Sequence, residues 1–198
     1  MTTESLSTLI ARVRDCRLCA DHLPLGPKPI LQVSEHAPIL IASQAPGTKA
    51  HTSGQTFLDA SGDRLREWLA VSADQFYDPR RFAILPMGMC YPGRLPQGGD
   101  RPPRPECAPR WRSEVLSHLR SVRLTLLVGS YSQVHVLGRG RMTERVYHYR
   151  DYLPSYFPLP HPSWRTGGWE KRNPWFRDDV IPALRMIVHD LINAAPRR

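Results

Sequence analysis

Four short runs of apolar residues divide the chain, and each has the length and composition of a strand. A turn-forming segment ends each run. Continuous apolar runs are typical of strands in a parallel sheet that is covered on both faces. The predicted strands are residues 38–42, 82–87, 124–129 and 156–159. The sequence therefore predicts a small sheet of four strands.

Helical spacing of apolar residues occupies the intervals around these runs, because apolar positions recur every three or four residues. Ser61 is the predicted N-cap of the second helix, and Pro182 is expected to kink or restart the last one. The predicted helices are residues 6–14, 61–69, 105–119, 131–137 and 175–194. Strands that alternate with helices predict an α/β fold, a three-layer α/β/α sandwich around a central, mostly parallel four-stranded sheet.

A chain of 198 residues has the length of one domain. We expect a single domain over residues 1–198, with the cysteine-bearing N-terminal segment 1–30 packed on it. The sequence contains no apolar run long enough to cross a bilayer and no basic-then-apolar leader. These features predict a cytoplasmic protein without a membrane partner.

The chain is basic, with 27 Lys plus Arg against 18 Asp plus Glu and a formal net charge of +9. A basic balance favours polyanionic partners through Coulomb attraction and the release of counterions. Many basic proteins bind no polyanion. The charge therefore indicates nucleic acid only in combination with a motif.

All four cysteines fall into two pairs. Cys16 and Cys19 form a C-x2-C motif, and Cys90 and Cys107 bracket a proline-rich loop with little apolar content. Four thiolates suit zinc or an iron–sulfur cluster, and the spacing does not decide between them. A disulfide framework is not expected without an export signal. Buried or incidental thiols are the simpler alternative to a metal site.

The cysteines belong to an ordered set of motifs. The loop after the first predicted strand contains QAPG at 44–47 and GQTFLDASG at 54–62, and His-Pro-Ser at 161–163 follows the fourth strand. With the cysteine spacing, this set resembles the iron–sulfur branch of the uracil-DNA glycosylase superfamily. The resemblance implies a monofunctional DNA glycosylase that hydrolyses the N-glycosidic bond of a damaged base in base excision repair. It also implies a [4Fe–4S] cluster, with zinc as the alternative, held by Cys16, Cys19, Cys90 and Cys107.

The resemblance assigns catalytic roles within these motifs. Such an enzyme rotates the target nucleotide out of the stack, and Phe57 occupies the position of the ring that stacks on the flipped base. His161 matches the donor that stabilises negative charge on the departing base. Asp59 is the nearest carboxylate for stabilising the sugar cation or orienting the attacking water. His51 is a further candidate for the water or for a phosphate.

Other residues of the same motifs are expected to contact the substrate. Those expected beside the base are Gln44, Ala45 and Gly47. Ser163 is expected to hold a phosphate, and Trp164 and Arg165 are expected to enter the minor groove as a wedge and a phosphate anchor. The expected partner is DNA containing a damaged base. We expect a monomer without an obligate protein partner.

Several positions depart from the family's pattern. Ala45 stands where some members carry a catalytic Asp, and Gln44 stands where the thermophile type has Glu. The Asn that reads the edge of uracil is expected at the position of Pro86. The excised base is therefore uracil or another deaminated or oxidised base. Asp59 and Asp63 also flank a predicted helix start, where capping or the helix dipole explains a carboxylate equally well.

Two other classes of function fit parts of the sequence. A nucleic-acid-binding member of the superfamily that has lost catalysis would explain why Pro86 replaces the Asn and why Gln44 and Ala45 depart from the family's pattern. An iron–sulfur redox or sensor protein would use the four cysteines for electron transfer. The second alternative leaves the His-Pro-Ser loop without a role.

Overall fold

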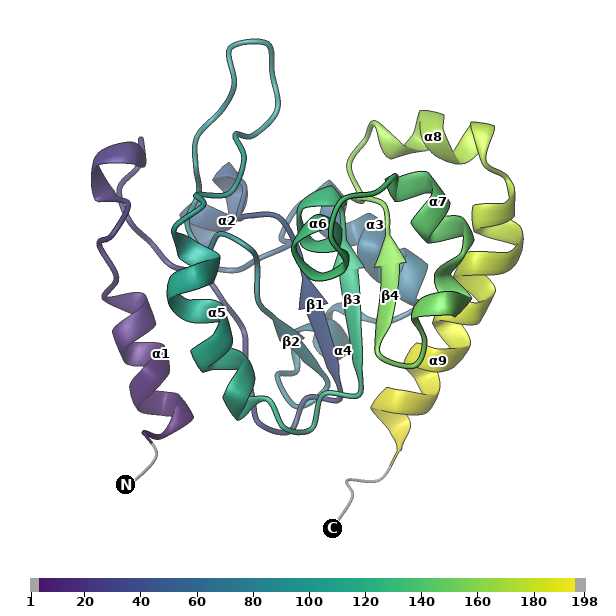
Figure 1. Ribbon diagram of the computed structural model, residues 1–198, viewed down its shortest axis with the longest axis horizontal. Helices are drawn as coiled ribbons and strands as arrows, with labels where there is room; N and C mark the ends of the chain where they lie inside the picture. The colour runs from purple at the N-terminus through teal and green to yellow at the C-terminus, as the bar shows by residue number, and fades with distance from the viewer. Residues whose placement is uncertain (1–3, 195–198) are drawn as a thin grey trace.

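The computed structural model describes residues 4–194 and contains one four-stranded sheet (Figure 1). All neighbouring strands are parallel, in the order β2-β1-β3-β4. The strands are β1 (Ile39–Ala42), β2 (Phe82–Ile84), β3 (Leu124–Val128) and β4 (Tyr156–Leu159). Because the strands run the same way, their carboxyl ends meet at one edge, where ligands bind in sheets of this kind.

Both faces of the sheet are buried, which explains why its strands read as continuous apolar runs. Ile39 and Ile41 of β1 point into a large core, and Leu40 and Ala42 point to the opposite face. One group of helices covers the large core, and a second group covers the opposite face. The predicted three-layer α/β/α sandwich is confirmed.

The helices form two layers, one on each face of the sheet. Over the large core lie α3 (Ala60–Leu69), α4 (Ala73–Tyr77), α7 (Met142–Tyr147) and α9 (Ile181–Asn193). On the opposite face lie α1 (Leu6–Arg14), α5 (Cys107–His118) and α6 (Ser130–Leu137). Two short helices follow the carboxyl ends of β1 and β4, namely α2 (Thr48–Ser53) and α8 (Thr166–Arg172). Across residues 4–194, no helix has the length and apolar character needed to cross a membrane.

Some predicted boundaries differ from the structure. The expected N-cap of α3, Ser61, lies inside the helix, and Asp59 is the cap instead. The strand predicted over 82–87 ends at Ile84, although the Leu85 and Met87 N–H groups still donate hydrogen bonds to the Ile41 and Ser43 carbonyls beside it. The restart expected at Pro182 is confirmed, since a π-helical turn (Phe176–Val180) precedes α9 and Pro182 lies in its first turn.

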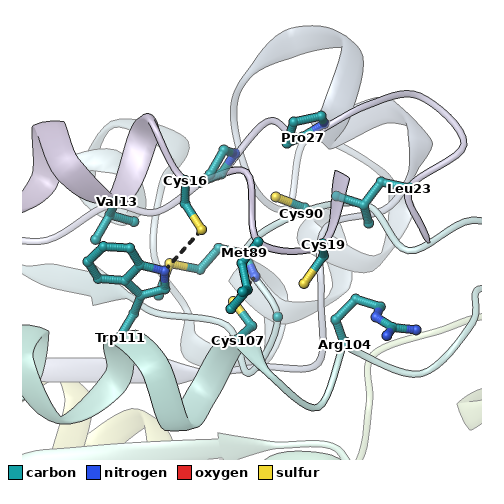
Figure 2. Close-up of a pocket in the computed structure, with 13 residues that line it drawn as sticks. Val13, Cys16, Cys19, Leu23, Pro27, Met89, Cys90, Arg104, Cys107 and Trp111 are labelled. Carbon is teal, nitrogen blue, oxygen red and sulfur yellow. Dashed lines mark hydrogen bonds between the residues drawn. The ribbon is translucent and has the colours of Figure 1, made fainter. Parts of the chain in front are cut away.

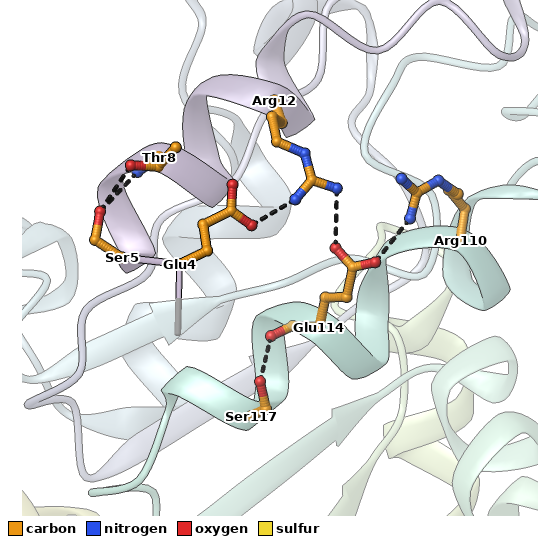
Figure 3. A network of polar contacts seen from close by, with 7 residues as sticks. All are labelled: Glu4, Ser5, Thr8, Arg12, Arg110, Glu114 and Ser117. Carbon is orange, nitrogen blue, oxygen red and sulfur yellow. Dashed lines mark hydrogen bonds and ion pairs between the residues drawn. The ribbon is translucent and has the colours of Figure 1, made fainter. Parts of the chain in front are cut away.

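The N-terminal helix α1 packs against α5 and carries the first cysteine pair at its end. Leu9 and Val13 of α1 are buried against this side of the sheet. At the surface, Arg12 forms ion pairs with Glu4 and with Glu114 of α5, the latter at 3.3 Å (Figure 3). Exposed pairs of this kind contribute little stability. The apolar contacts therefore fix α1 on the domain.

Candidate active site

A pocket lies at the carboxyl edge of the sheet, formed by loops that follow three of the strands. It encloses about 510 Å³ of space that opens to solvent. Its walls contain an aromatic ring, an imidazole and two carboxylates, contributed by Phe57, His161, Asp59 and Asp100. The remaining lining residues are small or apolar: Ser43, Ala45, Pro46, Gly47, Ala50, Thr56, Ser61 and Pro86. Polar chemistry in this pocket is thus concentrated on a few side chains.

His161 is held in the loop that follows β4. Its backbone carbonyl accepts hydrogen bonds from the Ser163 N–H, at 2.8 Å, and from the Thr166 hydroxyl. Gly129, directly after β3, packs against the ring, because a Cβ on Gly129 would lie 3.3 Å from the His161 Cβ. Burial lowers the pKa of His161, and the charge of Asp59 opposes that shift. The imidazole is therefore neutral at pH 7 and has one N–H to donate.

The Asp59 side chain both caps a helix and lines the pocket. Its Oδ1 accepts a hydrogen bond from the Gly62 N–H at 3.0 Å, which caps the N-terminus of α3. The same side chain lines the pocket with His161. The capping interpretation of this carboxylate is confirmed. Capping also fixes the direction of the carboxylate, since the helix holds one of its oxygens.

The backbone at Phe57 adopts a left-handed conformation, with φ of +60°, that residues other than glycine rarely take. Its carbonyl accepts hydrogen bonds from the Tyr77 hydroxyl at 3.0 Å and from Arg66 at 3.2 Å. Gly62 lies directly against this carbonyl, because a Cβ at Gly62 would be 1.6 Å from the Phe57 oxygen. The ring packs edge-on against Phe76 at 5.9 Å and lines the pocket. These contacts hold the strained backbone in place.

Two expected residues lie outside the pocket lining. The Gln44 amide donates a hydrogen bond to the Arg101 carbonyl at 3.4 Å. The His51 ring, on α2, lies against Tyr91 with ring centroids 6.2 Å apart, and its buried Nδ1 has no hydrogen-bond partner within residues 4–194. The structure therefore supplies no support for a catalytic His51 or a base-contacting Gln44. Ala45 and Gly47 of the same loop do line the pocket.

The segment after His161 projects from the surface. The Trp164 side chain is among the most exposed large apolar groups, at 79%. The Arg165 guanidinium lies 5.3 Å from the centroid of the Trp164 ring. Ser163 is half-buried, and its carbonyl accepts a hydrogen bond from Arg64 of α3. Arg64 thereby ties this loop to the helix that Asp59 caps.

Sequence reasoning missed several residues around this site, among them Asp100 and Gly129. Asp100 lies in the proline-rich loop between the last two cysteines, and no local motif marks its position. Gly129 follows β3 with φ of +86°, and its contact with His161 depends on the neighbouring strand β4. The only signal for Gly129 was its place at the end of a predicted strand.

The four cysteines line a second pocket, beside α1 and α5 (Figure 2). Cys16 and Cys19 come from the segment after α1, and Cys90 and Cys107 from the two ends of the proline-rich loop. The indole N–H of Trp111 donates to the Cys16 Sγ at 3.2 Å (Figure 2). A segment near the N-terminus and a loop distant in sequence thus present their thiols to one space.

The electrostatics of this pocket disfavour free thiolates. Burial raises the pKa of Cys90 and of Cys107 to about 11 in each case, and the other thiols add to the shift. The Met89 backbone N–H donates to the Cys107 Sγ at 3.4 Å, a contact that favours an anionic sulfur. Among residues 4–194, no three His, Cys, Asp or Glu side chains are arranged to hold a metal ion. The pocket presents four thiols, and two of them accept N–H hydrogen bonds. This arrangement fits a cationic cluster of several atoms.

The fold and the pocket define an α/β protein whose site lies at the carboxyl edge of a parallel sheet. The sequence matches the family model of the Uracil DNA glycosylase superfamily over residues 31–185, and the chain belongs to this superfamily of DNA glycosylases. The matched region includes Cys90 and Cys107 and begins after Cys16 and Cys19.

One solved structure is similar to this chain. It is a solution NMR structure of a candidate uracil DNA glycosylase from Methanosarcina acetivorans. The similarity covers 79% of this chain and 94% of that chain, with 14% sequence identity and a TM-score of 0.46.

Proposed function

We propose that the protein is a monofunctional DNA N-glycosylase that hydrolyses the bond between a deaminated base, uracil or a related base, and deoxyribose. The observation that carries the proposal is that a half-buried, neutral His161 and the Asp59 carboxylate line the same pocket. Breaking a glycosidic bond leaves negative charge on the base and positive charge on the sugar. The pocket provides a donor for the first charge and a carboxylate for the second.

The reaction would begin with a flipped nucleotide, because the bond is out of reach inside a stacked duplex. The Phe57 ring offers a face on which the base can stack. His161 would donate its N–H to a carbonyl oxygen of the leaving base. Asp59, oriented by its bond to the Gly62 N–H, would stabilise the sugar as its positive charge develops. Water then completes the hydrolysis by adding to C1′ of the deoxyribose.

The identity of the base depends on the wall that contains Pro86. This residue lines the pocket and provides no amide to pair with uracil. Ser43 and Thr56, both buried, are the hydroxyl-bearing residues on the same lining together with Ser61. A pocket without an amide reader favours a substrate defined by a carbonyl that His161 can contact. Uracil, hypoxanthine and xanthine all meet this requirement.

DNA would reach the pocket across the exposed loop after His161. Trp164 presents an apolar wedge beside a cationic Arg165, a combination that proteins use to enter the minor groove. The net charge of +9 favours the phosphate backbone. Ser163 is suited to one phosphate contact. We propose that the protein acts as a monomer on DNA without an obligate protein partner.

We further propose that Cys16, Cys19, Cys90 and Cys107 hold a [4Fe–4S] cluster, with zinc as the alternative. When bound, the group would supply metal–sulfur bonds that join the N-terminal segment to the proline-rich loop. The supporting observation is the shared pocket with N–H donors to two of its sulfurs. Elemental analysis of the purified protein separates iron with sulfide from zinc.

The test of the main proposal is a panel of labelled oligonucleotides. Each carries uracil, hypoxanthine, xanthine or a normal base, single- or double-stranded, and alkali then converts abasic sites to strand breaks. We expect breaks at one or more deaminated bases with the wild type and at least about 100-fold fewer with His161→Ala. His189→Ala, which removes an exposed imidazole from α9, is the matched control and should cleave normally. Binding without cleavage of any base would overturn the proposal and favour the nucleic-acid-binding alternative.

A further inference from the structure

A hairpin within the proline-rich loop delivers Asp100 to the pocket. Residues 93–101 form the turn, in which Arg94 and Asp100 pair as an antiparallel bridge and the Leu95 N–H donates to the Gly99 carbonyl at 2.9 Å. Gly98 and Gly99 have φ values of +92° and +87°, a conformation that favours glycine. The hairpin therefore has a defined shape, and the position of Asp100 is set by its backbone. Figure 1 shows this segment as the long loop that precedes α5.

The Asp100 carboxylate lies over the loop that follows β1. Its Oδ2 is 3.4 Å from the point where a Cβ on Gly47 would sit. Ala45 of this same loop lines the pocket with a methyl group and supplies no polar atom from its side chain. Asp100 thus brings a carboxylate to a wall where the segment 44–47 provides none.

The two carboxylates of the pocket differ in their partners. One carboxylate oxygen of Asp59 accepts a hydrogen bond from the Gly62 N–H. For Asp100, no side-chain hydrogen bond or ion pair forms with any residue in the part of the chain that the structure describes, 4–194. A carboxylate without a protein partner is free to accept a hydrogen bond from water or substrate.

The charged groups around Asp100 come from three elements. Burial raises the pKa of the Asp100 carboxyl, the hairpin's own Arg94 opposes the shift, and the charge of Asp59 adds to it. Arg165, from the loop after His161, lies near Gly99, at 3.5 Å from the position of a Cβ there. The neutral His161 is the remaining titratable side chain of the pocket. A carboxylate with a raised pKa is a stronger base than an ordinary surface aspartate.

We infer that Asp100 is the general base that takes a proton from the attacking water, an inference that rests on the proposed glycosylase function. The water oxygen forms a bond to C1′ while one of its protons passes to the Asp100 carboxylate. The C1′–N bond breaks, and its electron pair stays on the base, whose carbonyl accepts the His161 N–H. The base then takes up one proton, so that the elements of water are added across the bond. Asp59 keeps the separate task of stabilising the sugar.

The test compares Asp100→Asn and Asp100→Glu with wild type, using single-turnover base release across a range of pH. We expect Asp100→Asn to lower the rate about 10²- to 10⁴-fold and to abolish the acid limb of the pH profile. Asp100→Glu should restore part of the rate together with that limb. Binding to the same DNA, measured by fluorescence anisotropy, should change less than about twofold, since a base on water does not anchor DNA. Asp151→Asn, at an exposed aspartate of the segment before β4, is the matched control.

Three results would count against the inference, and they are distinguishable. A folded Asp100→Asn that keeps a rate within about threefold of wild type, with its acid limb intact, overturns the role of Asp100 alone. A rate that falls only in proportion to lost DNA binding assigns Asp100 to binding and also overturns it. A wild-type protein that releases no base from any oligonucleotide overturns the glycosylase function and the inference with it.

Discussion

The Asp59 carboxylate accepts a hydrogen bond from the Gly62 N–H at 3.0 Å, and Gly62 in turn lies against the Phe57 carbonyl. One turn of α3 therefore positions both a carboxylate and an aromatic ring of the pocket. A side chain at Gly62 would collide with the Phe57 backbone. The start of this helix is thus part of the site.

Substitution of Asp59 separates its capping role from its charge. Asn caps helices about as well as Asp, so Asp59→Asn should change the free energy of unfolding by less than about 0.5 kcal/mol. Asp59→Ala removes the cap and should cost about 1 kcal/mol. Both variants lose the charge, and both should lower base release at least about 100-fold. Chemical denaturation and single-turnover rates measure the two effects. An active Asp59→Asn would restrict this residue to capping.

Gly129 and Gly138 flank α6 and provide a matched pair. Both have positive φ with extended ψ, so an alanine at either position should cost about 1 to 3 kcal/mol. Only at Gly129 would the new Cβ press on His161; at Gly138 nothing lies within 4 Å. We therefore expect Gly129→Ala to lower base release roughly tenfold to a hundredfold beyond Gly138→Ala, because a small displacement of His161 spoils its geometry. Equal activity of the two folded variants would contradict the assigned contact.

The lowered pKa of the half-buried His161 imidazole predicts a pH dependence of stability. The pKa of His161 is lowered in the folded protein, so its contribution is fully present above the unfolded pKa of about 6.5 and is lost as pH falls through the folded pKa. His161→Gln stays neutral at every pH. The loss of unfolding free energy between pH 7 and pH 5 should be smaller in this variant than in wild type. An identical loss in both proteins would show that the imidazole titrates as in solvent.

Removal of one thiol should affect folding and metal content together. A cross-link between segments as far apart in sequence as Cys19 and Cys90 contributes about 4 kcal/mol, which corresponds to about 10 °C in melting temperature for this length. Cys16→Ala should lose both the brown colour of a cluster and roughly that stability. Trp111→Phe removes the N–H donor to Cys16 and should weaken metal retention about 10- to 100-fold while keeping the four ligands. A stable, colourless and fully active Cys16→Ala would refute a structural cluster.

The sequence patterns predicted the layers of the fold because the strands are buried on both faces. β3 and β4 appear where continuous apolar runs placed them. The short helices α2, α4, α7 and α8 were not predicted, since five to seven residues are too few for a periodic pattern.

The site was partly predictable for a similar reason. His161, Asp59 and Phe57 follow strands or open a helix within recognisable motifs, and the structure brings them to one pocket. The place of Asp100 in the pocket depends on how a glycine-containing hairpin folds back over another loop. No local sequence pattern encodes that contact. His51 lies outside the pocket lining, and a sequence motif does not tell which side of α2 faces the pocket.

The most decisive experiment measures the release of free base under single-turnover conditions by mass spectrometry. Oligonucleotides that carry one deaminated base would be incubated with wild type and with Asp59→Asn. The proposed glycosylase function predicts about one equivalent of free base and one abasic site per wild-type protein, with release about 100-fold slower or more in the variant. Folded wild-type protein that binds these oligonucleotides and releases no base would contradict it.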